Sequence, residues 1–118
     1  MNSPDPLWEQ IRADAAATAR RESALAPMLE EVFLRRDSLA EALSVRLARK
    51  LAYHSTPESQ LHDIFLESFH VNPVIIGQVR ADIVAIKERD PACRDVLTPV
   101  LYFKGFHSIT CYRLAHHL

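Results

Sequence analysis

One carboxylate in the chain occupies a position where chemistry could take place. Asp90 precedes Pro91, and a proline ring disfavours helical backbone for the residue before it, so a helix should end at Asp90. A carboxylate at this corner can accept charge-assisted hydrogen bonds from a ligand ammonium, and these are stronger than neutral ones. The plainer alternative is that Asp90 only ends its helix and supports the turn before Pro91. Spacing alone favours that alternative.

The six histidines raise the question of a metal site. His54, His62 and His70 are eight positions apart, which does not place a ligand pair one turn apart on a helix. His116 and His117 point in different directions on a helix, and the chain has no Cys-x-x-Cys or His-Glu-x-x-His motif. We therefore predict no metal site and interpret the histidines as surface or capping residues.

Nucleophilic catalysis and phosphate binding also lack their motifs. A Ser or Cys nucleophile needs a base that a third group orients, and no nucleophile-elbow sequence is present. Cys111 falls in the middle of a predicted helix, where a buried structural thiol is the simpler interpretation. The chain also has no glycine-rich loop of the kind that binds a phosphate. We predict no catalytic residue and no bound cofactor in this chain, and give neither His107 nor His117 the role of a base.

Composition limits the class of protein. The chain has 118 residues, of which 48% are apolar and 25% charged, with a net charge of −1, as in a soluble globular domain. This charge predicts no attraction to nucleic acid or to anionic membranes. The N-terminus has no signal-peptide pattern, and no apolar run approaches the roughly 18 residues of a membrane span. With two scattered cysteines that indicate reduced thiols, we expect a cytoplasmic protein.

Proline and glycine indicate which elements position Asp90. Only two glycines occur, and four prolines follow capping residues, in the pairs Asp5-Pro6, Thr56-Pro57, Asn72-Pro73 and Thr98-Pro99. Such pairs are typical of helix starts. We predict an all-α fold, a compact multi-helix bundle of about six to eight helices in a single domain over residues 1–118.

The expected helices follow from these starts and from apolar spacing. They run from Pro6 to about Leu25, from Pro27 through Phe33, over Leu39–Leu51 behind a capping box of Ser38 and Glu41, from Pro57 through Phe69, from Pro73 to Asp90, over Val100–Lys104, and over Phe106–Leu118. The Pro73 helix is apolar enough to be the centre of the bundle. Gly77 within it suggests close helix–helix approach, and Gly105 should break the last two helices apart.

The end of the chain resembles a known family. The segment RDPA at 89–92, followed after a short gap by TPxLYxKGFHxxxxYRxAH from Thr98, is similar to the end of the N-terminal α-helical domain of bacterial serine O-acetyltransferases. Leu7–Ile11, Leu39–Leu51 and Asn72–Ile86 match the family more loosely. The resemblance covers essentially all 118 residues.

The resemblance implies an activity and a role for Asp90. The family transfers an acetyl group from acetyl-CoA to the hydroxyl of L-serine in cysteine biosynthesis, and its RDPA aspartate contacts the substrate serine. Its catalytic histidine and its acetyl-CoA site belong to a left-handed β-helix of hexapeptide repeats, which this sequence lacks. The last helix also stops without a cap. We therefore expect a truncated N-terminal part that contributes Asp90 to the serine site and is inactive alone.

The resemblance also implies partners. The family joins two trimers into a hexamer through its N-terminal helices, so we expect a homo-oligomer, although the sequence does not identify the contacting faces. One alternative is a stand-alone, non-catalytic assembly or regulatory module that binds a full-length acetyltransferase. A helical DNA-binding protein is disfavoured, because the arginines are balanced by Glu and Asp and form no continuous basic stripe.

Overall fold

The structure is a computed structural model that describes residues 5–52, 56–91 and 93–117. Within these residues the elements are seven α-helices and two short helical segments, which confirms the all-α prediction. In chain order they are α1 (Pro6–Arg21), the 3₁₀ segment η1 (Ser23–Leu25), α2 (Ala26–Leu29), the π-helical segment η2 (Glu30–Leu34), α3 (Leu39–Leu51), α4 (Glu58–Val71), α5 (Pro73–Arg89), α6 (Leu97–Tyr102) and α7 (Lys104–His117). None of these helices is both long and apolar enough to cross a membrane.

Local capping explains where several helices begin. The Asp5 side chain accepts a hydrogen bond of 3.2 Å from the backbone N–H of Trp8 and caps α1. Ser38 caps α3 in the same way, accepting a 3.2 Å bond from the N–H of Glu41. The Glu41 carboxylate reaches back and accepts from the N–H of Asp37 at 3.0 Å. Each cap satisfies a donor that the first helical turn leaves without an intrahelical partner.

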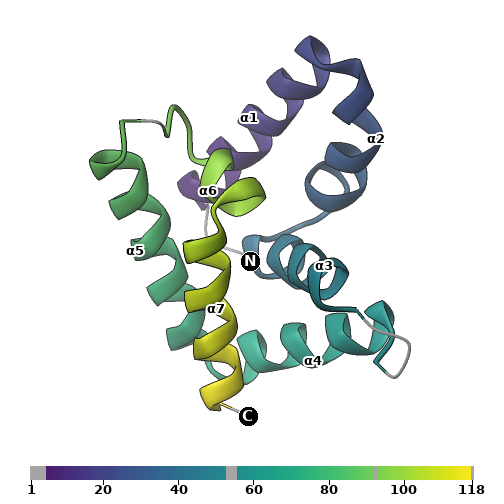
Figure 1. The fold of residues 1–118 in the computed structure, drawn as a ribbon, viewed down its shortest axis with the longest axis vertical. Coiled ribbons are helices and arrows are strands. Elements are labelled where there is room, and N and C mark those ends of the chain that lie inside the picture. The colour runs from purple at the N-terminus through teal and green to yellow at the C-terminus, as the bar shows by residue number, and fades with distance from the viewer. Residues whose placement is uncertain (1–4, 53–55, 92, 118) are drawn as a thin grey trace.

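The centre of the molecule is α3 and not α5, so the expectation for α5 is wrong. Figure 1 shows α3 between α2 and α4, and seven of its residues are buried: Leu39, Ala42, Leu43, Ser44, Val45, Leu47 and Ala48. In contrast, α5 buries only Ile75, Val79 and Ile83, and its valines Val74 and Val84 are exposed. Helix α3 packs closely on α4 and also contacts η2, whereas the apolar residues of α5 are spread around the helix and only some are buried.

Both glycines play smaller roles than predicted. A Cβ added to Gly77 would meet no atom within 4 Å, so this glycine marks no close helix–helix approach. Gly105 lies inside the first turn of α7, and the break between α6 and α7 falls at Phe103, whose φ of −79° and ψ of 105° are extended. The chain turns there without a positive φ among the described residues, so the corner needs no glycine.

Several helix starts also differ from the prediction, with α6 beginning at Leu97 instead of Val100 and α7 at Lys104 instead of Phe106. Thr98 is not the N-cap of α6, because that helix begins at Leu97. The side chain of Asp95 instead accepts hydrogen bonds from Thr98, at 2.8 Å from its N–H and 2.7 Å from its hydroxyl. The fourth helix begins one residue later than predicted, with Pro57 at its N-cap position. In both cases the pair of residues correctly indicates a nearby helix start, but which residue is the first helical one depends on neighbouring side chains.

Two long helices frame the region around Asp90. Helices α5 and α7 lie side by side, and the short helix α6 crosses between the end of α5 and the start of α7 (Figure 1). Arg113 on α7 donates to Asp82 on α5 at 3.3 Å, and Arg80 on α5 pairs with Asp5 at the start of α1. These contacts hold α5 against α7 and against the start of α1.

Candidate functional site

Asp90 occupies the C-cap position of α5. Its backbone N–H donates to the carbonyl of Ile86 at 3.0 Å, and its own carbonyl accepts from the N–H of Cys93 at 3.0 Å. Its φ of −99° and ψ of 112° are extended, as the following proline requires. The sequence therefore predicted both the helix end and the corner correctly. The residue is half-buried, at the edge of a hollow.

The hollow, called here the Asp90 hollow, has a volume of about 570 Å³. One wall is the end of α5, and the opposite wall is the α6–α7 corner with the start of α7. The lining residues are Ala85, Ile86, Arg89, Asp90, Pro91, Phe103, Lys104, Gly105, Phe106 and Ile109. The two walls lie close in space, although the loop after α5 and helix α6 separate them in the chain. The wall formed by the end of α5 carries the carboxylate of Asp90.

The residues that line the Asp90 hollow suit a small polar ligand that also has an apolar part. Asp90 provides a carboxylate, while Arg89 and Lys104 each provide a cation on a separate wall. Ile86 and Phe106 supply apolar surface. A ligand ammonium would find an acceptor in Asp90, and a ligand anion would find donors in the two cations. Among the described residues no histidine lines the hollow, so this lining offers no imidazole base.

The segment that follows Asp90 is held from two sides. Its backbone N–H at Val96 donates to the carboxylate of Asp14 on α1 at 3.2 Å. The thiol of Cys93 is buried and donates to the carbonyl of Asp95 at 3.1 Å, and its burial raises the pKa of that thiol. Cys93 is therefore a packed thiol and not a reactive thiolate. These contacts restrain the backbone that carries Asp90.

The opposite wall is held by His107, which is buried with 2% of its surface exposed. Its Nε2 lies 2.7 Å from the carbonyl oxygen of Val100, and its Nδ1 lies 2.8 Å from Nζ of Lys50 on α3. Burial, with the nearby Lys50 and Arg46 cations, lowers the pKa of His107 below its usual value. The sequence analysis gave His107 no catalytic role, and both of its ring nitrogens already have partners.

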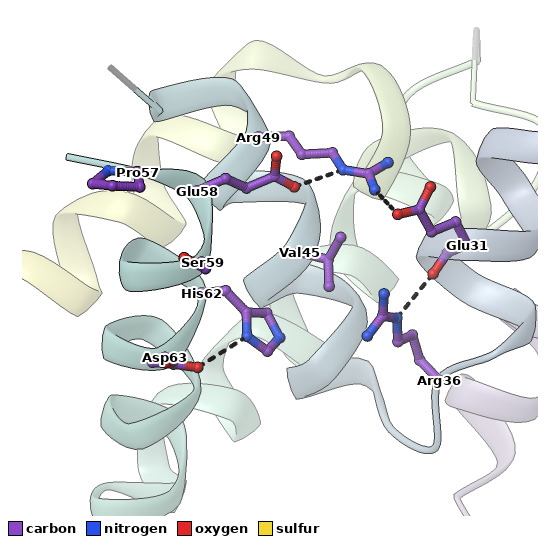
Figure 2. A pocket seen from close by; sticks show the side chains of 9 residues that line it. All are labelled: Glu31, Arg36, Val45, Arg49, Pro57, Glu58, Ser59, His62 and Asp63. Carbon is purple, nitrogen blue, oxygen red and sulfur yellow. Dashed lines mark hydrogen bonds and ion pairs between the residues drawn. The ribbon is translucent and has the colours of Figure 1, made fainter. Parts of the chain in front are cut away.

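A second hollow, of about 480 Å³, lies between α3, α4 and η2 (Figure 2). Arg49 bridges two carboxylates there, contacting Glu31 and lying 2.8 Å from Glu58. These contacts with Glu58 and Glu31 raise the pKa of Arg49. Figure 2 also shows His62 beside Asp63, at 3.4 Å. Because Arg49 is already paired with two carboxylates, we interpret this surface as an ion-pair network that joins helices.

The remaining histidines are scattered. His54 lies outside the described residues, His70 is exposed, and the ring of His116 stacks on Tyr112 with centroids 5.7 Å apart. Within the part of the chain that the structure describes, no three His, Cys, Asp or Glu side chains gather in a way that could hold a metal ion. Among the residues singled out from the sequence, Asp90 lines the Asp90 hollow and His62 lines the second hollow. The sequence analysis missed Lys104 and the Lys50–His107 contact.

Comparisons with known proteins place this arrangement in context. The sequence model of the family described as "Serine acetyltransferase, N-terminal" matches residues 7–111. The serine acetyltransferase of Haemophilus influenzae is 41% identical over 112 residues, covering 95% of this chain and 42% of that protein. The enzyme of Salmonella typhimurium is 38% identical, with 95% and 41% covered. The chain thus spans about two fifths of the length of these curated relatives.

Solved structures show the same similarity in three dimensions. The serine acetyltransferase of Neisseria gonorrhoeae in complex with serine has a TM-score of 0.94 and 40% identity, covering 99% of this chain and 48% of that one. A serine acetyltransferase in complex with CoA has a TM-score of 0.93 and 41% identity, covering 96% and 48%. The fold described above is therefore similar to about half of each of these chains.

Proposed function

Because this chain belongs to the serine acetyltransferase family through its N-terminal domain, we propose that it is the helical part of an enzyme acetylating L-serine. In that reaction the serine hydroxyl attacks the thioester carbonyl of acetyl-CoA. The C–S bond breaks, and O-acetyl-L-serine and CoA leave. The relatives solved with serine and with CoA support these two substrates. The comparisons do not favour the alternative of a stand-alone assembly module.

The observation that carries the proposal is Asp90 at the mouth of the Asp90 hollow. The serine ammonium would donate to its carboxylate, a charge-assisted bond that orients the amino acid without a proton transfer. The positive side chains of Lys104 and Arg89 lie around the same space. Asp90 would thus select an amino acid, and the base and the acetyl-CoA site would come from outside this chain.

The proposal extends to assembly and location. We expect residues 1–118 to form one domain, since their buried apolar residues make one continuous cluster. In the complete enzyme this domain would contribute to a hexamer built as a dimer of trimers, and the enzyme would work in the cytoplasm. Alone, the domain would bind no cofactor and release no CoA from acetyl-CoA and serine.

The test is a set of Asp90 variants in the complete enzyme that carries this chain. Asp90→Ala should raise the serine KM about 10- to 100-fold, as expected for losing a hydrogen bond to a charged group, and should leave the acetyl-CoA KM within about twofold. The serine KM of Asp90→Asn should lie between those of the wild type and Asp90→Ala, since asparagine keeps an acceptor but loses the charge. Asp37→Ala removes an exposed carboxylate outside the hollow and is the matched control. An unchanged serine KM in Asp90→Ala would refute the proposal.

A further inference from the structure

The α6–α7 corner, which forms half of the Asp90 hollow, is closed by one buried imidazole. Four consecutive lining residues, 103 to 106, directly precede His107. The His107 backbone N–H donates to the carbonyl of Phe103 at 3.0 Å, and its ring reaches back to the carbonyl of Val100 at 2.7 Å. The ring therefore spans the corner from α7 to α6. Its orientation determines where the wall opposite Asp90 lies.

The partner of the other ring nitrogen determines the tautomer. Lys50 contacts Nδ1 at 2.8 Å, and a lysine ammonium has donors but no acceptor. Nδ1 must therefore accept, so the single proton of the neutral ring resides on Nε2 and is donated to Val100. One lysine on α3, 57 positions away in sequence, thus orients the ring that closes the corner.

We propose that Lys50 and His107 are positioning residues that hold the wall at Phe103–Phe106 in the geometry needed to bind the amino-acid substrate opposite Asp90. This inference rests on the proposed function. Lys50 does not line the hollow, and neither residue touches the reacting atoms. Their contribution is to keep the width of the hollow constant, because a buried ring with an unpaired Nδ1 would turn or take up a proton.

The charges facing His107 make the pair sensitive to pH. Lys50 and Arg46, both on α3, act on the ring, and Lys50 also acts on the thiol of Cys111 one turn along α7. A protonated imidazole cannot accept from Lys50, and two cations would then repel at this distance. Since burial and these cations lower the pKa of His107, the contact is intact at neutral pH and is lost only in acid.

The first experiment observes the ring directly. In the 118-residue chain labelled with ¹⁵N, the imidazole resonances of His107 at pH 7.5 should show a protonated Nε2 and an unprotonated Nδ1. Lys50→Met keeps the length of the side chain, removes the donor and should raise the pKa of His107. A ring protonated on Nδ1 in the wild type would overturn the proposal.

The second experiment measures kinetics in the complete enzyme. Lys50→Met should raise the serine KM about tenfold at pH 7.5 with kcat reduced less than about twofold, the pattern of a misplaced binding wall. Lys50→Arg keeps a donor and should restore the KM. The KM ratio of Lys50→Met to wild type should fall towards one as the pH falls through the lowered pKa of His107, because the wild type then loses the same contact. Arg35→Met removes a positive charge outside the hollow and should leave the KM unchanged.

Two results would overturn the inference. One is a serine KM in Lys50→Met equal to that of the wild type, which would mean that the pair only stabilises the fold. The other is a KM ratio that does not change with pH. Asp90→Ala is measured alongside: if it raises the KM and Lys50→Met does not, only the positioning role fails. If Asp90→Ala leaves the KM unchanged, the proposed serine site fails, and this inference with it.

Discussion

The carboxylate of Asp14 on α1 accepts a hydrogen bond of 3.2 Å from the backbone N–H of Val96, 82 positions further along the chain. The same carboxylate accepts from the side chain of Gln10 at 2.8 Å. This contact fixes the connection between α5 and α6, which directly follows Asp90. The first helix thus takes part in shaping the candidate site at the other end of the sequence.

Replacing Asp14 should loosen that connection. Asp14→Ala leaves the half-buried N–H of Val96 without its acceptor, and a hydrogen bond to a charged group is worth about 1.5–3 kcal/mol. We expect the free energy of unfolding to fall by about 1–2 kcal/mol, since the site is partly exposed, as measured by urea denaturation. Asp14→Asn keeps an oxygen acceptor and should lose less. Equal losses in both variants would contradict a role for this bond.

Ser38 should be a measurable helix cap. Its hydroxyl accepts from the N–H of Glu41 at the start of α3, the most buried helix. Ser38→Ala should lower the free energy of unfolding by about 1 kcal/mol, the usual cost of losing an N-cap side chain. Ser59→Ala, on an exposed serine in the first turn of α4, is the control and should change stability by less than about 0.5 kcal/mol. If the two variants are equally stable, Ser38 does not act as a cap.

His107 should make the chain less stable in acid. Its pKa is lowered in the folded state, so the unfolded state binds more protons whenever the pH lies near or below 6.5. The stability that the neutral ring contributes is fully present above about pH 6.5 and is lost as the pH falls through the folded-state pKa. The midpoint of urea unfolding, followed from pH 8 to pH 5, should therefore fall in the wild type.

The control for this pH dependence is a histidine that is exposed. His70 lies on the surface of α4, so His70→Gln should keep the acid-dependent loss of stability. His107→Gln should remove most of it, because the titrating buried group is gone. If His107→Gln loses stability in acid as steeply as the wild type, another group is responsible for the effect.

The ion-pair network around Arg49 should contribute little and depend on salt. Arg49 contacts Glu31 and Glu58 at a partly exposed surface (Figure 2). Arg49→Met should cost under about 1 kcal/mol, because exposed pairs are screened by water. The difference from wild type should shrink between about 0.01 M and 1 M salt, where the screening length falls from about 30 to 3 Å. A difference unaffected by salt would indicate lost packing of the arginine stem instead.

The fold class and several helix boundaries could be predicted from the amino-acid sequence alone. The caps at Asp5 and Ser38 and the end of α5 at Asp90 depend on bonds between residues a few positions apart, and Pro73 supplies the first residue of α5 although Asn72 makes no side-chain cap bond. Such bonds are set by local side chains and by the fixed φ of proline, so a short stretch of sequence is enough to predict them. The sequence also showed the family resemblance, through the motif at residues 89–116, and the family match confirms it.

Which helix is most buried and what surrounds Asp90 became visible only once the helices were packed together. Helix α5 has more apolar residues than it buries, because burial depends on which neighbouring helices contact each of its faces. The wall with Lys104, the Lys50–His107 contact and the Asp14–Val96 bond join residues distant in sequence. No local pattern specifies such pairs, since they form only when packed helices bring their side chains together. The corner carboxylate was predictable from the sequence, and the hollow beside it was not.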